Sequence, residues 1–269
     1  MEADDTHTVA PARREVQFSQ SAPYATGAEV RRRFGFSDAP PEYAIAKEKF
    51  RLVVPETYST NSAWGLLVWI SPADSPQIPP DWEAELAAQG FILVGAYNSG
   101  NNRNAMDRIR LALDATCNVC RQFKIDRPRI YVGGLSGGAR MASLLGVGYA
   151  DIFTGTFCVC GVSFYQDVPA GPGQVYPAHY APYPRVLPLA KRSGRFVLLT
   201  GEHDFNRDNT KAVFEKGFRL NGFSRVTYLE VPGMGHAMPG AAKLKSALEY
   251  LAGGAPAPSP NEAAKDVIH

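Results

Sequence analysis

The sequence predicts an α/β fold in which a mostly parallel sheet carries helices on both faces. Strand-like and helix-like segments alternate from Lys47 to Leu251. This order is typical of parallel strands that are joined by crossover helices. The segment FILVGA has the apolar character of a buried strand, and the helical segments carry apolar residues at spacings of three and four.

The predicted elements follow one another in a regular order. The runs KEKFRLVVP and WGLLVWIS are two strands bounded by Pro, Asn and Ser. A helix over PDWEAELAAQ, with a proline near its start, leads to the strand FILVGA and then to a helix over RNAMDRIRLALDATCNVCRQF. The alternation continues through RIYVGGL, the helix after Ser136, GTFCVCG, RFVLLT, NTKAVFEKGFRL, RVTYLEV and AAKLKSALEYLA.

One domain is expected over residues 46–252, because a chain of 269 residues with 45% hydrophobic residues is able to bury one large core. Residues 1–45 are polar and lack a sustained period, which predicts an irregular arm on the surface. Residues 253–269 begin with GGAPAPSP, and this composition predicts a disordered tail.

The charge balance excludes several classes of partner. The formal net charge is +2 and no run of Lys or Arg stands out, which argues against nucleic acid and anionic membranes. No apolar run approaches the roughly 20 residues of a membrane span, and MEADDTHTVA lacks the features of a signal peptide. A processed N-terminus would look the same, so a secreted or periplasmic location is compatible with the sequence. We expect a small-molecule or polymeric substrate. The sequence does not indicate which oligomeric state the protein has.

The segment Gly134-Leu135-Ser136-Gly137-Gly138 matches the pattern G-x-S-x-G between a predicted strand and a predicted helix. A sharp turn there holds the serine in a strained conformation, and glycines flank it because side chains two positions away would collide. The turn exposes the Ser136 hydroxyl, while the Gly137 N–H and the helix N-terminus point toward the same space and favour an oxyanion. The alternatives are an incidental serine in a glycine-rich turn and a phosphate-binding loop, but no lysine follows as a P-loop requires.

A serine nucleophile needs a base and an orienting acid, which follow this motif in the order Ser, acid, His. Asp204 follows the strand RFVLLT, and His236 lies in the glycine-rich segment PGMGHAMPG after the strand RVTYLEV. Both therefore lie past the carboxyl ends of strands, where parallel sheets form active sites. The rivals for the two roles share the loop of the acid: Glu202, His203 and Asp208.

These segments give the chain a family resemblance. It resembles the α/β-hydrolases, and within them the esterase group of extracellular poly(3-hydroxybutyrate) depolymerases and feruloyl esterases. GLSGGARMA is similar to the nucleophile segment of that group, GEHD to its acid loop and GMGHAMPG to its histidine loop. The resemblance spans Phe50 to Leu251 and implies Ser136 as nucleophile, Asp204 as acid and His236 as base. It implies no metal or organic cofactor.

The sequence departs from this group at the second oxyanion donor. The group carries His-Gly after the strand that corresponds to LLVWIS, whereas this chain has Ser71-Pro72-Ala73-Asp74. That segment resembles the Ser-Pro-Gly-aromatic turn of cutinase-like polyester hydrolases. We expect the oxyanion hole to combine the backbone N–H groups of Gly137 and Asp74, because Pro72 has no N–H to donate.

Two loops are candidates for binding the substrate. The first is an insert over about residues 164–190, and its position in the chain order places it over the carboxyl edge of the predicted sheet. It contains four tyrosines, Tyr165, Tyr176, Tyr180 and Tyr183. It forms either an aromatic wall for the substrate or a stiff surface loop whose tyrosines pack on the body. The loop YNSGNNRN reaches the same edge with three side chains that either bind polar substrate groups or serve the turn, namely Asn98, Asn101 and Arg103.

The four cysteines form two close pairs, Cys117 with Cys120 on one helical face and Cys158 with Cys160 on one strand face. A zinc site is disfavoured because neither pair has the loop setting of a zinc knuckle. A redox C-x-x-C is disfavoured because the helical pair lies late in its helix. Buried thiols or a disulfide are expected, and a disulfide would favour secretion.

The sequence therefore predicts a serine carboxylesterase that forms an acyl-enzyme on short-chain or aromatic esters, with polyester and feruloyl-type esters as candidates. A serine peptidase or amidase would use the same triad, but the sequence gives no sign of an extended-chain cleft. A non-catalytic binding protein of this fold would be expected to lack a triad member, and all three are present.

Overall fold

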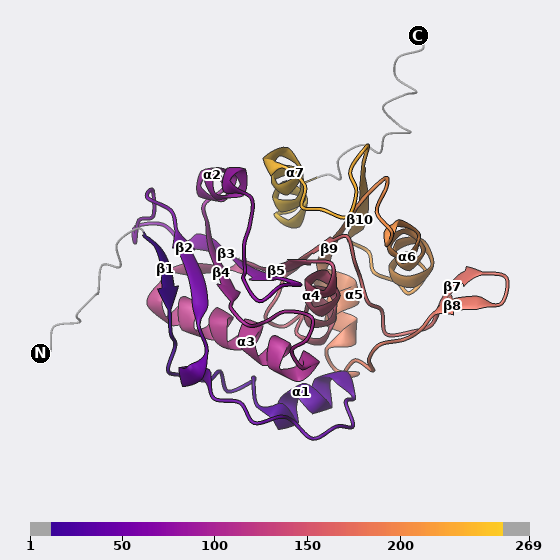
Figure 1. Cartoon of the computed structure of the whole chain (residues 1–269), viewed down its shortest axis with the longest axis horizontal. Coiled ribbons are helices and arrows are strands. Elements are labelled where there is room, and N and C mark those ends of the chain that lie inside the picture. Colours follow the sequence, from indigo (N-terminus) through magenta and orange to yellow (C-terminus); the bar gives the residue numbers. More distant parts are fainter. Residues whose placement is uncertain (1–11, 255–269) are drawn as a thin grey trace, which may run out of the picture.

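The computed structural model describes residues 12–254, and its centre is a mostly parallel sheet (Figure 1). The sheet has eight strands: β1 (Ala12–Val16), β2 (Phe50–Val54), β3 (Trp64–Ile70), β4 (Phe91–Ala96), β5 (Ile125–Leu135), β6 (Gly155–Val159), β9 (Arg195–Gly201) and β10 (Val226–Val231). Their order is β1-β2-β4-β3-β5-β6-β9-β10. The β1–β2 and β2–β4 pairs are antiparallel, and every pair from β4 to β10 is parallel. The predicted fold class is therefore confirmed.

Helices cover both faces of the sheet. One face carries α1 (Gly27–Phe34), α3 (Ala105–Gln122), α4 (Gly137–Gly148) and α5 (Leu187–Ser193). The other face carries α2 (Pro80–Ala88) and α7 (Ala241–Leu251), which pack against each other. The remaining helical elements are η1 (Ile45–Lys47), α6 (Arg207–Ala212) and η2 (Val213–Arg219), a π-helical turn that continues α6.

Strand β3 shows how the sheet separates two apolar cores. Successive side chains of a strand point to opposite faces. Leu66 and Val68 accordingly join the core under α3 and α4, whereas Leu67 and Trp69 join the core under α2 and α7. Trp69 meets the α2 residue Trp82 edge to face, with ring centroids 5.0 Å apart. β3 is therefore buried on both faces and lies between the two cores.

Within residues 12–49, the chain packs on the domain and includes regular elements, in contrast to the irregular arm that the sequence predicts over residues 1–45. β1 extends the sheet, and α1 buries Val30 and Phe34 completely. Asp114 of α3 holds the intervening chain, because its carboxylate accepts the Ala22 N–H and the Tyr43 hydroxyl. The prediction failed because these few apolar residues recur without a regular period.

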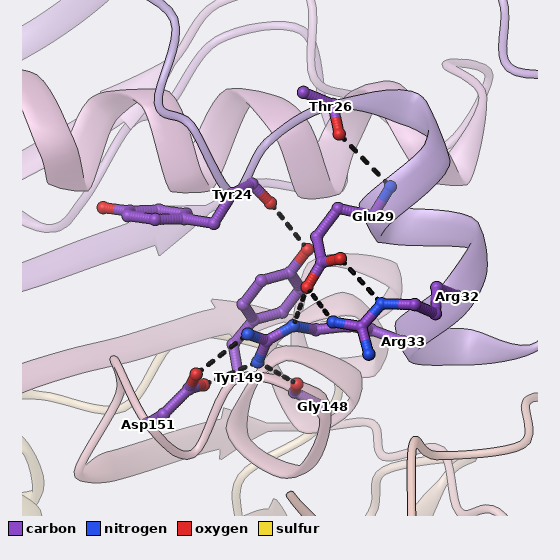
Figure 2. A network of polar contacts seen from close by, with 8 residues as sticks. All are labelled: Tyr24, Thr26, Glu29, Arg32, Arg33, Gly148, Tyr149 and Asp151. Atoms are coloured by element: carbon purple, nitrogen blue, oxygen red, sulfur yellow. Dashed lines mark hydrogen bonds and ion pairs between the residues drawn. The ribbon is translucent and has the colours of Figure 1, made fainter. Parts of the chain in front are cut away.

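A network around Arg33 fastens α1 to the end of α4 (Figure 2). The Arg33 guanidinium donates to both carboxylate oxygens of Asp151, at 2.6 and 2.8 Å, and to the Gly148 carbonyl at 3.0 Å. Its Nε–H donates to Glu29, and the guanidinium carbon lies 4.2 Å from the centre of the Tyr149 ring. Bidentate pairs of this kind fix geometry as well as add energy. The network therefore positions the helix that follows Ser136.

The insert after β6 contains a hairpin of β7 (Val168–Gly171) and β8 (Gln174–Tyr176), which projects beyond the rest of the domain in Figure 1. Within residues 12–254, no helix combines the length and apolarity that a bilayer span needs. Of the tail that the sequence predicts to be disordered, residues 255–269 lie outside the described part of the chain.

Candidate active site

Ser136 lies on a sharp turn between β5 and α4, with φ 54° and ψ −118°. L-residues other than glycine rarely adopt a positive φ. The flanking glycines have the predicted steric reason, because a Cβ at Gly138 would lie 1.9 Å from the Ile70 carbonyl oxygen. A Cβ at Gly134 would lie 2.4 Å from the backbone of Gly138. The packing around the turn therefore holds Ser136 in its strained conformation.

Asp204 and His236 lie in the loops after β9 and β10, where they form a hydrogen-bonded pair. His236 Nδ1 lies 2.7 Å from Asp204 Oδ1. Asp204 also accepts the Thr200 hydroxyl at 2.6 Å and the Asn206 N–H at 3.0 Å. Burial alone would raise the pKa of Asp204, but these hydrogen bonds outweigh burial and hold the pKa below its usual range. The Asp204 carboxylate therefore stays ionised and is able to orient the imidazole.

The rival residues in the acid loop point elsewhere. Glu202 and His203 are exposed, and Glu202 accepts the N–H of Gly233 at 2.8 Å. Asp208 is exposed and lies 3.8 Å from the Arg207 guanidinium. Glu202 therefore shapes the loop that carries His236, whereas Asp204 contacts the imidazole itself.

Ser136 opens into a cleft of about 540 Å³. Its lining is mixed: Phe36, Asn101, Ala105, Arg108, Gly137, Arg140, Met141, Leu144, Ser163, His179, Phe205 and Asn206. In the described part of the chain, no hydrogen bond joins the Ser136 hydroxyl to His236. Hydrogen bonds between catalytic groups are often long in the absence of substrate and tighten when substrate binds.

The two predicted oxyanion donors differ in position. Gly137 lines the cleft, and its Cα lies so close to Asn101 that an added Cβ would be 2.0 Å from Asn101 Oδ1. Asp74 is exposed and does not line the cleft; its carbonyl accepts the Asn98 N–H at 2.7 Å. The role of the Asp74 N–H therefore stays a prediction. Asn98 serves the turn at φ 50°, so Asn101 is the asparagine that reaches the cleft.

Most of the predicted tyrosines pack on the body. Tyr165 and Tyr180 lie in the aromatic cluster around Phe164 and Phe34, and Tyr183 lies under the Arg32 guanidinium. None of these three lines the cleft. Tyr176 lines a smaller adjoining pocket together with Arg140, His179 and Phe205. Tyr180 contacts Phe34 and Tyr183 contacts Arg32, both on α1, whereas Tyr165 packs against Phe164 and Phe223.

Two arginines of the cleft, the buried Arg108 and the half-buried Arg140, were missed at the sequence level. Arg108 follows Asp107, which pairs with Arg103 and Arg110 four and three residues away on α3. Residues adjacent in sequence point to different sides of a helix, so Arg108 is directed elsewhere. Arg140 stands in the quoted segment GLSGGARMA, four residues after Ser136 and therefore one helical turn away. The helical spacing could have indicated both residues.

The four cysteines are free thiols. Cys160 does not share a strand face with Cys158, because β6 ends at Val159 and Cys160 has φ 54°. Potential ligand atoms of Cys160, Asp204 and His236 lie within 4.8 Å of one another, and this is the one such group within residues 12–254. Burial and the charge of Asp204 raise the pKa of Cys160 to about 12, which disfavours the thiolate that a metal ion would require.

Comparison with known proteins identifies the fold. The chain matches no protein-family model and no curated protein sequence. Among solved structures, it resembles the feruloyl esterase module from Clostridium thermocellum complexed with sinapinate, with 14% identity, a TM-score of 0.60 and coverage of 96% of this chain and 94% of that one. It resembles S-formylglutathione hydrolase from Staphylococcus aureus with 10% identity, a TM-score of 0.60 and coverage of 91% and 100%.

A further similarity extends to a putative dipeptidyl aminopeptidase IV from Bacteroides ovatus, with 16% identity and a TM-score of 0.54. That match covers 75% of this chain but only 33% of the other, so three quarters of this chain correspond to a third of that chain. At identities this low the similarities establish the fold and transfer no residue roles. The chain has the α/β-hydrolase fold, as the sequence resemblance implied.

Proposed function

We propose that this protein is a serine carboxylic-ester hydrolase that acts through Ser136, His236 and Asp204. The proposal rests on the backbone of Ser136, which is held at φ 54° at the edge of a cleft. Strain of this kind persists where the surroundings over-determine it, and it concentrates at active sites. A turn with no chemical role would not require two glycines and a strained serine.

The mechanism assigns one role to each residue. The Ser136 hydroxyl attacks the ester carbonyl while His236 Nε2 accepts its proton, and Asp204 holds the imidazole tautomer and stabilises the imidazolium. The Gly137 N–H stabilises the oxyanion that forms. His236 then protonates the departing alcohol, which leaves an acyl group on Ser136. Water, activated by His236, releases the acid in the second half of the reaction.

Short-chain or aromatic esters are the substrates that the cleft accommodates best. Its volume of about 540 Å³ suits a small molecule, and its apolar wall is formed by Phe36, Met141, Leu144 and Phe205. The aromatic surface thus comes from phenylalanines of other segments more than from the tyrosines of the insert. The similarity to a feruloyl esterase complexed with sinapinate, which is an aromatic molecule, is in keeping with this class.

An active-site label tests the proposal directly. A fluorophosphonate should add once to the wild-type protein, and peptide mapping should locate the adduct at Ser136. Ser136→Ala should abolish labelling and lower kcat for p-nitrophenyl butyrate by about 10⁴- to 10⁶-fold. Ser246→Ala changes a serine of α7 outside the cleft and serves as the matched control. Normal labelling or more than a tenth of wild-type activity in Ser136→Ala would contradict the assignment.

Matched substrates separate an esterase from an amidase of the same fold. We expect hydrolysis of p-nitrophenyl butyrate with little or no hydrolysis of the corresponding anilide. A panel of acetate, butyrate, decanoate, benzoate, feruloyl and polyester substrates then identifies the ester class. An optimum at decanoate would exclude the short-chain and aromatic preference, and faster cleavage of the anilide would identify an amidase.

A further inference from the structure

Two cationic side chains of the cleft lack an anionic partner. Arg108 and Arg140 both line the cleft that contains Ser136, and the cleft lining includes no Asp or Glu. Among residues 12–254, neither arginine takes part in an ion pair. Arg103 and Arg110, on the same helix as Arg108, both pair with Asp107. The lack of an anionic partner therefore distinguishes the arginines that line the cleft from Arg103 and Arg110 on the same helix.

Arg108 is the more deeply buried of the two. Its exposure is 4%, and it donates to the Ser71 carbonyl at 3.0 Å and weakly to Asn101 Oδ1 at 3.5 Å. Its Nε is buried without a hydrogen-bond partner. A guanidinium has five N–H donors, so much of the donor capacity of Arg108 is unused. Burial lowers its pKa to about 10, which means that the surroundings do not compensate the charge.

Arg140 places a second guanidinium on the same cleft. It donates to the Val162 carbonyl at 2.9 Å and, at 3.4 Å each, to the side-chain oxygens of Asn206 and Asn209. All three acceptors are uncharged, and burial lowers the pKa of Arg140. Burial is the larger cause of the lowered pKa of His179, and the positive charge of Arg140 lowers this pKa further. The field of Arg140 therefore acts on groups that line the cleft.

We propose that the cleft binds esters that carry a second, ionised carboxyl group, such as the half-esters of dicarboxylic acids. Buried charges are normally paired, and a substrate carboxylate would provide the anion that the protein does not supply. Guanidinium groups bind carboxylates with directed, charge-assisted hydrogen bonds. The apolar wall of Phe36, Met141 and Leu144 receives the hydrocarbon or aromatic spacer between the two carbonyl carbons. This inference rests on the proposed function, whose scissile ester it places at Ser136.

A matched pair of substrates tests the inference. Monoethyl terephthalate is an anion, and ethyl 4-carbamoylbenzoate replaces its carboxylate with a neutral amide of nearly the same shape. We expect kcat/KM of the wild-type protein to be at least about tenfold higher for the anion, because one hydrogen bond to a charged group contributes enough free energy for a tenfold difference. Monoethyl adipate and its amide should give the same direction. A ratio of one or less with both pairs would overturn the inference.

Variants connect the preference to the arginines. Arg140→Gln should reduce the ratio at least about fivefold, whereas Arg140→Lys, which keeps the charge, should retain part of it. Arg108→Gln tests the second cation, and the melting temperature of each variant shows whether it is folded. Arg195→Gln is the control, because Arg195 also donates to a backbone carbonyl but lies at the amino end of β9, away from the cleft. A preference that survives both glutamine substitutions in folded protein would overturn the inference.

A binding measurement distinguishes this inference from the proposed function. Titration calorimetry of Ser136→Ala with monoethyl terephthalate should show binding that weakens at least about tenfold when Arg140→Gln is added. If the wild-type protein cleaves neither ester but this binding occurs, the carboxylate site stands and the proposed reaction fails. If the wild-type protein cleaves the neutral ester and the anion does not bind, the reaction stands and the carboxylate site fails.

Discussion

The Phe205 ring is stacked on the His236 imidazole, with ring centroids 4.1 Å apart and planes inclined by 23°. Phe205 is 77% exposed, so burial does not explain its place beside the imidazole. It follows Asp204 directly in the sequence, so the acid loop holds the His236 ring both by its edge and by its face. Phe205 lines the cleft whereas His236 does not, which makes Phe205 the cleft wall on the side of the imidazole.

Phe205→Ala should therefore lower kcat/KM by about 2- to 13-fold, because a stacked ring pair contributes about 0.5 to 1.5 kcal/mol. Steady-state kinetics with p-nitrophenyl butyrate measures this effect. Phe214→Ala removes another stacked ring, which lies on Tyr228 outside the cleft, and should leave the rate unchanged. Equal rates for Phe205→Ala and wild type would show that the stacking does not orient the imidazole.

His236→Ala should reduce ester hydrolysis by about 10⁴-fold or more, since it removes the proposed proton acceptor. His203→Ala should keep most of the activity, because this histidine is exposed and Asp204 contacts His236 instead. Both variants are compared by kcat at saturating substrate. The opposite pattern, with His203→Ala inactive and His236→Ala active, would require the two roles to be exchanged.

Gly138→Ala should destabilise the protein by about 3 kcal/mol and abolish activity, because its Cβ would lie 1.9 Å from a backbone oxygen that cannot move aside independently. Urea unfolding measures the free energy of unfolding. Gly171→Ala, in the projecting hairpin, brings its Cβ no closer than 3.9 Å to another atom and should be neutral. A fully active Gly138→Ala would mean that the turn tolerates rearrangement.

Asp114 should make stability depend on pH. Burial raises its pKa from the ordinary 3.8 to about 6, although the Ala22 N–H and the Tyr43 hydroxyl oppose this change. A raised folded-state pKa adds stability that is complete below pH 3.8 and is lost as the pH rises through 6. The difference corresponds to about 3 kcal/mol at most.

Asp114→Asn should remove this dependence, because an amide is able to contact Ala22 and Tyr43 without ionising. Compared with that variant, the wild-type protein should lose stability in urea unfolding between pH 4 and pH 7. Asp208→Asn, at an exposed position, should follow the wild-type profile. Parallel profiles for Asp114→Asn and wild type would contradict the raised pKa.

Tyr176→Ala should weaken a preference for aromatic over aliphatic esters by about 2- to 13-fold, because Tyr176 lines the pocket that adjoins the cleft. Tyr183→Ala should leave that preference unchanged, since its ring lies against Arg32 of α1. Comparison of kcat/KM for benzoate and butyrate esters measures both effects. An unchanged preference in Tyr176→Ala would remove Tyr176 from the substrate site.

The features that the sequence predicts correctly are those that the chain encodes locally. The glycines around Ser136 indicate the turn between strand and helix, and Asp204 and His236 each follow a recognisable strand. In contrast, the surroundings of Tyr180 and Arg108 depend on segments that are distant in the sequence. Tyr180 packs against Phe34 of α1, and Arg108 donates to the Ser71 carbonyl in the loop after β3. Apolar spacing along the chain carries no information about such encounters. For this reason the sequence predicted the fold and the loops that carry Ser136, Asp204 and His236, but it did not predict which side chains line the cleft.

The pairing of β1 with β2 has a consequence for solubility. β2 buries Phe50, Leu52 and Val54, and β1 covers the hydrogen-bonding edge of this apolar strand. The exposed charges of β1, Arg13 to Glu15, make the outer edge of the sheet unattractive to another strand. Without β1, the sheet would end in an uncovered apolar strand that invites edge-to-edge association between molecules. β1 is therefore expected to disfavour edge-to-edge association between copies of this protein.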